Sequence, residues 1–173
     1  MGKEKFKEPF LQSNGIPITL DNFEVNNLDN DSLSLDQKFD FTSNLSGTGD
    51  YKFFPLKLFS EFDKNPFLSD TRFSNINLGY SKTIILNTSI ELPSNYYLDE
   101  IPESASMESP EKDIVFSRKI SYNKENQTVY TNLKIEFDKS YYEADFYPTL
   151  KEVFKKLFNF LNEQLVFKKK QIP

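Results

Sequence analysis

The fold of this chain is decided by residues 141–167, which read YYEADFYPTLKEVFKKLFNFLNEQLVF. On a period of about 3.6 residues, the apolar side chains of this stretch fall on one broad stripe, and most charged and amide side chains fall opposite it. The stripe consists of Phe146, Tyr147, Leu150, Val153, Phe154, Leu157, Phe158 and Leu161. The pattern predicts one amphipathic helix, with Pro148 in the first turn, where a missing N–H costs no hydrogen bond, and Asp145 as the capping residue.

The apolar stripe needs a covering layer, since a surface of aromatic and aliphatic side chains this wide is unstable in water. No other segment repeats the helical period, so the layer must be a sheet. Alternating apolar and polar residues predict strands at 16–25, 33–41, 51–59, 84–92, 96–101, 114–122 and 129–137, with a short final strand at 165–167. We therefore expect a mostly β (β-rich α+β) fold, an antiparallel β-sandwich of about seven or eight strands with the C-terminal amphipathic helix packed on it.

Several positions along the chain carry more specific expectations. A break in the alternation at Asp21 and Asn22 predicts a bend or bulge in the first strand. Arg118 falls on the apolar side of its strand and therefore needs a partner. Residues 102–112 are polar and are interpreted as a loop, and residues 60–80, the longest irregular stretch, as a crossover between two sheets.

The length of 173 residues suits one domain with a substantial core and is short for two. Residues 1–15 are polar and unpatterned, and we interpret them as a linker or the end of a fragment. The predicted division is therefore a linker at 1–15 and a single sandwich-like accessory domain at 16–173.

The composition argues against several classes of function. The chain has no Cys and no His, so it lacks thiol nucleophiles, disulfides, the usual general base and the commonest transition-metal ligand. A net charge of -5 argues against nucleic-acid binding. No apolar run approaches the length of a membrane span, and the first residues lack the apolar core of a signal peptide. We predict no membrane insertion, cofactor, metal site or catalytic residue.

The first group of candidate functional residues lies in the crossover at 60–80. Asn65, Pro66, Phe67 and Arg72 combine a fixed backbone angle, an aromatic ring and a guanidinium in a loop of a length that is often functional. In one interpretation, Phe67 plugs the end of the sandwich, and Arg72 holds loop carbonyls or a carboxylate. In the other, part of the loop docks against a neighbouring domain.

Tyr96 and Tyr97 form the second group of candidates. Tyr has a flat face and a polar tip, so this pair could stack on a sugar ring or a peptide. Alternatively, one Tyr of the pair faces the core and has a structural role. The same two interpretations apply to Tyr141 and Tyr142.

Several short motifs follow one another in an order found in one known family. They are Asn65-Pro66-Phe67, Arg72, Gly79-Tyr80, Leu92-Pro93, Ile101-Pro102-Glu103-Ser104, Tyr147 to Phe154 and Leu165-Val166-Phe167-Lys168-Lys169. Over roughly residues 17–170 the chain resembles the C-terminal domain of unknown function that follows a transglutaminase-like domain in exported proteins of the Bacteroidetes type.

The resemblance implies a β-rich accessory domain of a larger transglutaminase-like (cysteine peptidase-like) protein that reaches the periplasm or cell surface. It implies no catalysis here, because the family's catalytic Cys, His and Asp lie in the preceding domain. The expected partner is that upstream transglutaminase-like domain of the same polypeptide, which this domain would pack on or orient. The given chain would then be a soluble fragment without a signal peptide.

Three classes of function remain, and each predicts a different surface. A non-catalytic module that packs on a neighbouring domain predicts an apolar patch near the N-terminal linker or the crossover at 60–80. A carbohydrate- or peptide-binding sandwich predicts a concave face lined by exposed Tyr and Phe beside Asn and Asp. An enzyme that uses only carboxylates predicts two buried, mutually close Asp or Glu residues with raised pKa values.

Overall fold

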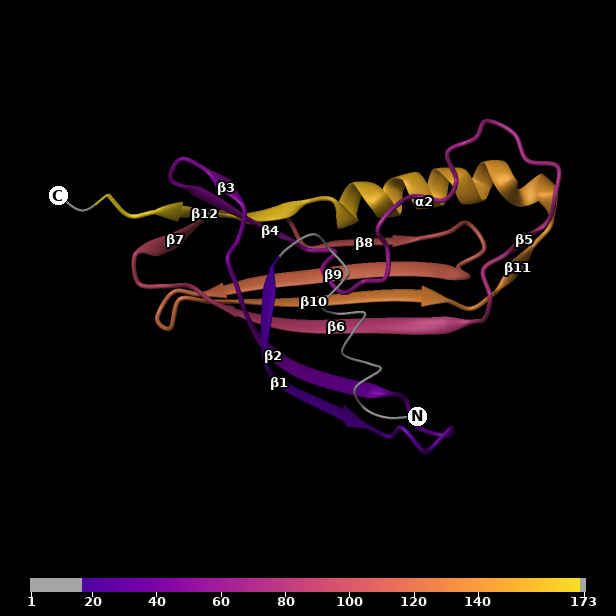
Figure 1. Cartoon of the computed structure of the whole chain (residues 1–173). Helices are drawn as coiled ribbons and strands as arrows, with labels where there is room; N and C mark the ends of the chain where they lie inside the picture. Colours follow the sequence, from indigo (N-terminus) through magenta and orange to yellow (C-terminus); the bar gives the residue numbers. More distant parts are fainter. Residues whose placement is uncertain (1–16, 172–173) are drawn as a thin grey trace. The chain divides into compact units, whose positions relative to one another are not determined.

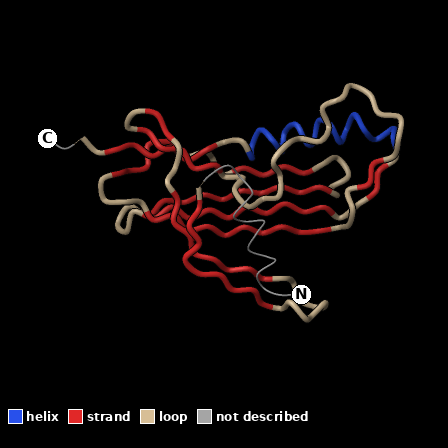
Figure 2. Tube along the Cα trace, viewed as in Figure 1, coloured by secondary structure: helices blue, strands red, loops and turns tan. Residues whose placement is uncertain are grey.

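The computed structural model of the chain describes residues 17–171. These residues form mostly strands, paired antiparallel, and one long helix near the C-terminal end (Figures 1 and 2). The mostly β fold class with one C-terminal helix is thus confirmed. The predicted linker at 1–15 lies outside the described residues.

Backbone contacts divide the chain into two compact units, Met1–Thr48 and Gly49–Pro173. Unit 1 contains the strands β1 (Ile18–Asn26), β2 (Asp36–Ser43) and β3 (Gly47–Thr48). Unit 2 contains β4 (Tyr51–Pro55), β5 (Ile76–Asn77), β6 (Lys82–Glu91), β7 (Tyr96–Glu100), β8 (Ala105–Glu108), β9 (Ile114–Asn123), β10 (Thr128–Phe137), β11 (Tyr141–Tyr142), the 3-10 turn η1 (Ala144–Phe146), the helix α2 (Tyr147–Leu161) and β12 (Gln164–Lys169).

Unit 1 is built on the antiparallel hairpin of β1 and β2. The register of the pair shifts between Leu20 and Asn22, so the irregularity predicted at this point is confirmed. The Thr42 hydroxyl donates a hydrogen bond to the Asp21 carboxylate at 3.0 Å. The two strands thus pair with each other in a two-stranded sheet.

The main sheet of unit 2 has the strand order β6-β10-β9-β8. Its period-two pattern pairs Ile114 and Phe116 of β9 with Phe137 and Ile135 of β10 on one face, where each of these side chains is at most 4% exposed. Strand β8 lies in the segment 102–112, which the sequence predicts as a loop. That prediction is wrong because a strand of four residues shows too little alternation to be recognised.

Helix α2 covers this face of the main sheet, as Figure 2 shows. The predicted stripe is confirmed, since the helix buries Tyr147, Leu150, Val153, Phe154, Leu157, Phe158 and Leu161. The ring of Phe160 stacks on Phe116 of β9 with 5.3 Å between the ring centroids. Burial of each large apolar side chain contributes roughly 1.5 to 3 kcal/mol. In unit 2, therefore, the two-layer packing expected of a sandwich is formed by helix on sheet.

The N-terminal end of α2 differs from the prediction. Asp145 is not the cap, because the N-cap position is Phe146 and no side chain makes a capping hydrogen bond there. Asp145 instead lies in η1, whose backbone bond from the Tyr147 N–H to the Ala144 carbonyl runs directly into the helix. The turn thus provides the helix start that the sequence analysis assigned to a side chain.

The C-terminal end of α2 is held by Arg118, which is 3% exposed. Its guanidinium donates to the carbonyl oxygens of Phe160 at 2.8 Å and Glu103 at 2.7 Å, and it pairs with the Glu163 carboxylate at 2.5 Å. The predicted need of Arg118 for a partner is confirmed. Because a helix end leaves carbonyl oxygens without intrahelical donors, this arginine fastens the end of α2 to β9.

The second sheet of unit 2 places β12 between β4 and β7. Leu165 of β12 pairs with Phe54 of β4, and Phe167 pairs with Leu98 of β7, so the predicted final strand is confirmed. The described residues contain twelve strands, more than the predicted seven or eight. Three of them, β3, β5 and β11, are only two residues long, which is too short to produce a periodic pattern.

Candidate functional site

The crossover loop, residues 60–80, connects β4 with β6 and contains β5. Its first half is fastened to α2 by Phe67, which is 3% exposed. The Phe67 ring packs edge-on against Phe154, with 4.6 Å between centroids, and against Tyr147, with 6.0 Å. The N–H of Phe67 donates to Oδ1 of Asn65 at 2.9 Å, which closes a local turn before the ring enters the core.

Two polar contacts continue this attachment along the helix. The Tyr147 hydroxyl donates to the Ser69 carbonyl at 2.7 Å, and Lys151 forms an ion pair with Asp70 at 3.0 Å. The Asp70 side chain is 99% exposed, so solvent screening leaves this pair with little effect on stability. The Tyr147 contact is the stronger anchor, because its side chain is itself buried.

The second half of the loop is fastened to the segment before the helix. Strand β5 pairs with β11, with Ile76 opposite Tyr142. The N–H of Ala144 donates to Oδ1 of Asn75 at 3.0 Å. Gly79 has a φ of 95°, a conformation that favours glycine, where the chain turns toward β6. The crossover loop is therefore held at both of its halves.

The crossover loop also carries three exposed apolar side chains, which we call the projecting side chains. Leu68 is 75% exposed, Phe73 is 95% exposed and Tyr80 is 68% exposed. Exposed apolar groups on an ordered loop mark interaction sites in many proteins. Leu68 and Phe73 were not among the predicted site residues, because a loop without periodicity gives no indication of which side chain faces the core.

The residues predicted for the interface have different positions in this loop. Phe67 lies in the core, so its ring cannot contact a neighbouring domain. Arg72 is exposed and donates from Nε to the Ser74 carbonyl at 3.1 Å, a contact that the structural interpretation of Arg72 expects. Asn65 is half-buried and Pro66 is exposed. An interface at this loop would therefore use the projecting side chains rather than Phe67.

Tyr96 and Tyr97 lie on β7 of the second sheet and not on the crossover loop. Both are half-buried, and they pair with Lys169 and Lys168 of β12. The Lys168 ammonium also lies 4.9 Å from the ring centroid of Tyr51. The two tyrosines thus lie on β7 opposite two lysines of β12. This position is separate in the fold from residues 65–72.

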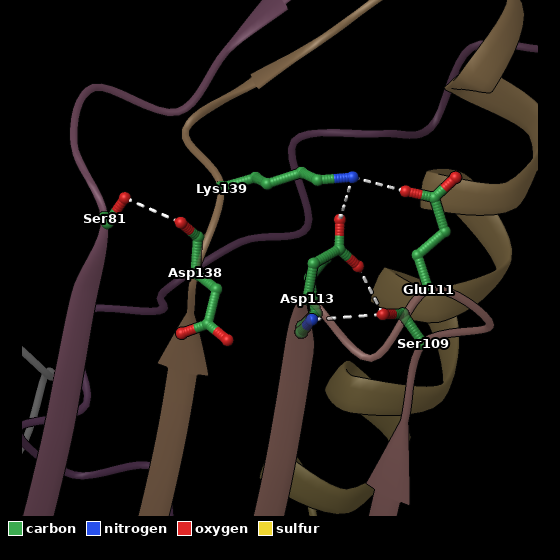
Figure 3. Close-up of polar contacts among 7 residues, drawn as sticks. Ser81, Ser109, Glu111, Asp113, Asp138 and Lys139 are labelled. Atoms are coloured by element: carbon green, nitrogen blue, oxygen red, sulfur yellow. Dashed lines mark hydrogen bonds and ion pairs between the residues drawn. The ribbon is translucent and has the colours of Figure 1, made fainter.

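The carboxylate-enzyme alternative directs attention to Asp113, the buried acidic residue among the described side chains, at 4% exposure. Figure 3 shows its surroundings at the start of β9. The Ser109 hydroxyl donates to Oδ1 of Asp113 at 2.5 Å and accepts from the N–H of Ile114 at 3.0 Å. Lys139 Nζ lies 3.7 Å from Oδ2 of Asp113 and also pairs with Glu111. These contacts fasten the turn between β8 and β9 to the end of β10.

The electrostatics of Asp113 also fit a fastened turn. Burial alone would raise the pKa of Asp113, but Ser109, the nearby Tyr142 hydroxyl, the backbone and the charge of Lys139 outweigh it, so the pKa is lowered. Burial and the Asp113 carboxylate in turn raise the pKa of Tyr142, although neither Oδ2 nor the Tyr142 hydroxyl has a hydrogen bond of full geometry. A carboxylate with a lowered pKa stays ionised at neutral pH and is a poor proton donor.

Residues 17–171 also bear on metal binding and on membrane insertion. No group of three or more His, Cys, Asp or Glu side chains in this range could hold a metal ion. Of the helices in the same part of the chain, none has the length and apolar character needed to cross a membrane.

Residues 50–167 match the family described as a domain of unknown function with a solved structure, DUF3858. The chain belongs to this family. The matched residues lie within unit 2 and include the main sheet, the crossover loop and helix α2, so these elements are the DUF3858 fold of this chain. No curated protein matches the sequence.

One solved structure is similar to this chain, the crystal structure of a "putative protease" from Parabacteroides distasonis, with a TM-score of 0.54 and 16% sequence identity. The match covers 68% of this chain and 23% of that protein's chain. At this identity the similarity shows a shared fold alone. The chain therefore spans less than a quarter of the length of the protein it resembles in structure.

Proposed function

We propose that this chain is a non-catalytic accessory domain of a larger transglutaminase-like, exported protein, and that it packs on or orients a neighbouring domain of the same polypeptide. The observation that carries the proposal is the exposure of Leu68, Phe73 and Tyr80 on a loop that is otherwise held against the core. The upstream transglutaminase-like domain implied by the sequence resemblance is the proposed partner.

The crossover loop is preorganised for binding. Phe67 and the pairing of β5 with β11 already order the crossover loop, so binding would not have to order it and would lose less conformational entropy. Burial of the projecting side chains would be favourable by roughly 25 cal/mol for each Å² of apolar surface removed from water. An interface centred on Phe73 fits the rule that a few aromatic anchors supply most of the binding energy.

The coverage of the Parabacteroides distasonis protein supports a modular role. The match covers 23% of that longer chain, which leaves room there for further domains, and interfaces between domains of one chain resemble transient protein–protein interfaces. The proposed location is the periplasm or cell surface, and it rests on the motif resemblance. The absence of Cys makes the fold independent of the redox state of that compartment.

The test is association with the domain encoded immediately before this one in the full-length gene. The double variant Leu68→Ser, Phe73→Ser should bind the separately produced neighbouring domain at least about tenfold more weakly, with an unchanged melting temperature for the isolated chain. Ile85→Ser is the matched control, because Ile85 is also exposed, at 56%, but lies on β6. Equal affinity of the double variant and the native chain would contradict the proposal.

A carbohydrate- or peptide-binding module is the alternative function. The platform predicted for it is Tyr96 and Tyr97, which are half-buried on β7, the edge strand beside β12. Loss of binding to a sugar or peptide on Tyr97→Ala, with the fold intact, would favour this alternative over docking.

A further inference from the structure

The face of the main sheet that points away from α2 carries a distinct set of side chains. Leu133 and Ile135 of β10 face the helix, so Tyr130 and Asn132, which alternate with them, face the other way. Opposite residues on neighbouring strands point to the same side of a sheet. The outer face therefore holds two adjacent rows across β6, β10 and β9, which are Asn87-Asn132-Lys119 and Ser89-Tyr130-Ser121.

These two rows line an open depression of about 490 Å³, together with Thr88, Ile120 and Thr131. Tyr130 lies at its centre between two serines and is 44% exposed. Because serine is small, the strand neighbours of Tyr130 leave its ring open. Asn126 donates to the Tyr130 hydroxyl at 3.4 Å, which steadies the tip of the ring.

The polar groups beside Tyr130 are suited to a ligand rich in hydroxyl groups. Nδ2 of Asn132 donates to Oδ1 of Asn87 at 2.7 Å, which orients both amides. That bond uses one N–H of Asn132 and the oxygen of Asn87, so the oxygen of Asn132 and the NH2 group of Asn87 remain to bind a ligand. Ser89 and Ser121 add hydroxyls that can donate and accept.

The charge of the depression is the opposite of the charge of the chain. Lys119 is the one ionisable Lys, Arg, Asp or Glu side chain among its lining residues, whereas the chain as a whole has a net charge of -5. Glu136, which lies farther along the outer face of β10, is already paired with Lys134. An anionic group placed beside Lys119 would therefore meet a cation with no acidic neighbour in the lining.

We propose that this outer-face depression binds an acidic saccharide. The Tyr130 ring stacks on the C–H face of one sugar, the amides of Asn87 and Asn132 bind its hydroxyls, and Lys119 pairs with the carboxylate of a uronic acid. A peptide is the poorer fit, because recognition of an extended peptide uses free backbone groups at a sheet edge, and β10 at the centre of this site is paired on both sides. The site is separate from the crossover loop and does not depend on the docking proposal.

The test uses the whole chain and two named probes, a short oligomer of galacturonic acid and a maltooligosaccharide of the same length. In nuclear magnetic resonance titrations at low salt, the galacturonate oligomer should shift the resonances of Asn87, Asn132 and Tyr130. Tyr130→Ala should weaken binding by about three- to tenfold, the range for loss of an aromatic contact, and Tyr130→Phe should keep it. Lys119→Met should remove the dependence of the affinity on salt.

Two controls separate this site from nonspecific binding. Tyr80→Ala removes a more exposed tyrosine, at 68%, from the crossover loop and should leave galacturonate binding unchanged, whereas it belongs to the surface used in the docking test. Absence of shifts with either probe at millimolar concentrations would overturn the proposal. Equal affinity for the neutral maltooligosaccharide would overturn the assignment of an acidic ligand.

Discussion

Phe67 and Phe73 are six positions apart in the same loop, yet the first ring is 3% exposed and the second is 95% exposed. Phe67 follows Pro66 and precedes Leu68, Phe73 lies between Arg72 and Ser74, and neither ring lies in a helix or strand. The difference comes from the neighbours that each position meets. Phe67 enters the cluster formed by Tyr147 and Phe154 of α2, whereas Phe73 lies at a point of the loop where no core residue packs against it.

The comparison shows how one connection can serve the core and the surface at once. The core-facing part of the loop is ordered by burial of an apolar side chain. Loss of side-chain volume there lowers the free energy of unfolding, because it leaves a cavity. The exposed part depends on the first for its position and contributes little to stability itself. Such a loop can present apolar side chains to a partner. Substitution of those side chains should leave the domain folded.

The largest expected effect is that of truncating the buried ring. Phe67→Ala should lower the free energy of unfolding by about 3 to 5 kcal/mol, since it removes an aromatic side chain from a packed core and leaves a cavity. Phe73→Ala should change it by less than about 0.5 kcal/mol. Urea denaturation of both variants measures the two values, and similar values would remove the contrast between the two halves of the loop.

Helix α2, against which Phe67 packs, provides a second test. Leu157→Ala on the buried face of α2 should cost about 2 to 5 kcal/mol, because Leu157 is 0% exposed and its loss leaves a cavity. Lys156→Ala, on the exposed face of the same helix, is the matched control and should have almost no effect. Equal midpoints of chemical denaturation would show that the helix face is assigned wrongly.

The buried pair of Asp113 and Tyr142 should make the free energy of unfolding depend on pH. The pKa of Asp113 is lowered from its ordinary value of 3.8, so its contribution is present above about pH 4 to 5 and is lost as the pH falls through the folded value. The pKa of Tyr142 is raised from 10.0, so its contribution is present below about pH 10 and is lost as the pH rises further.

Two variants separate these limbs of the pH profile. Asp113→Asn should remove the acid limb and also weaken the alkaline limb, because the Asp113 carboxylate helps to raise the pKa of Tyr142. Tyr142→Phe should remove the alkaline limb and only reduce the acid limb, because Ser109 and Lys139 still lower the pKa of Asp113. Melting temperatures measured from acid to alkaline pH give the profile. Unchanged profiles in both variants would show that neither group contributes through its ionisation. Because Tyr142 pairs with Ile76 of the crossover loop, loss of this anchor would also loosen the exposed half of the loop.

The smallest effect is expected at Arg72. Its side chain is exposed and makes one hydrogen bond to a carbonyl two residues away, so Arg72→Ala should change stability by less than about 0.5 kcal/mol. Reduced association with the neighbouring domain at an unchanged melting temperature would place Arg72 in the interface. A clear drop in melting temperature would show instead that the guanidinium fixes the loop, and the exposed half would then be less independent than the comparison suggests.

The sequence determined the features that repeat along the chain. The stripe from Tyr147 to Leu161 predicted the helix and its buried face, and alternation predicted the long strands of the main sheet, because periodic patterns report which side of an element is apolar. The burial of Arg118 could be predicted in the same way. It is a charged residue on the side of a strand that otherwise carries apolar residues, so it needs a partner. The crossover loop was chosen as a candidate site for its length and lack of period, and that choice stays a prediction.

The tertiary structure decided everything that depends on contacts between distant segments. Strands of two to four residues, such as β5, β8 and β11, exist because a neighbouring strand offers hydrogen-bond partners. They are too short to show a periodic pattern in the sequence. The positions of Phe67 inside the core and Phe73 outside it follow from where α2 lies, about eighty residues later in the sequence. Burial is a property of the assembled fold, so a sequence without periodicity cannot assign it to one of two chemically identical side chains.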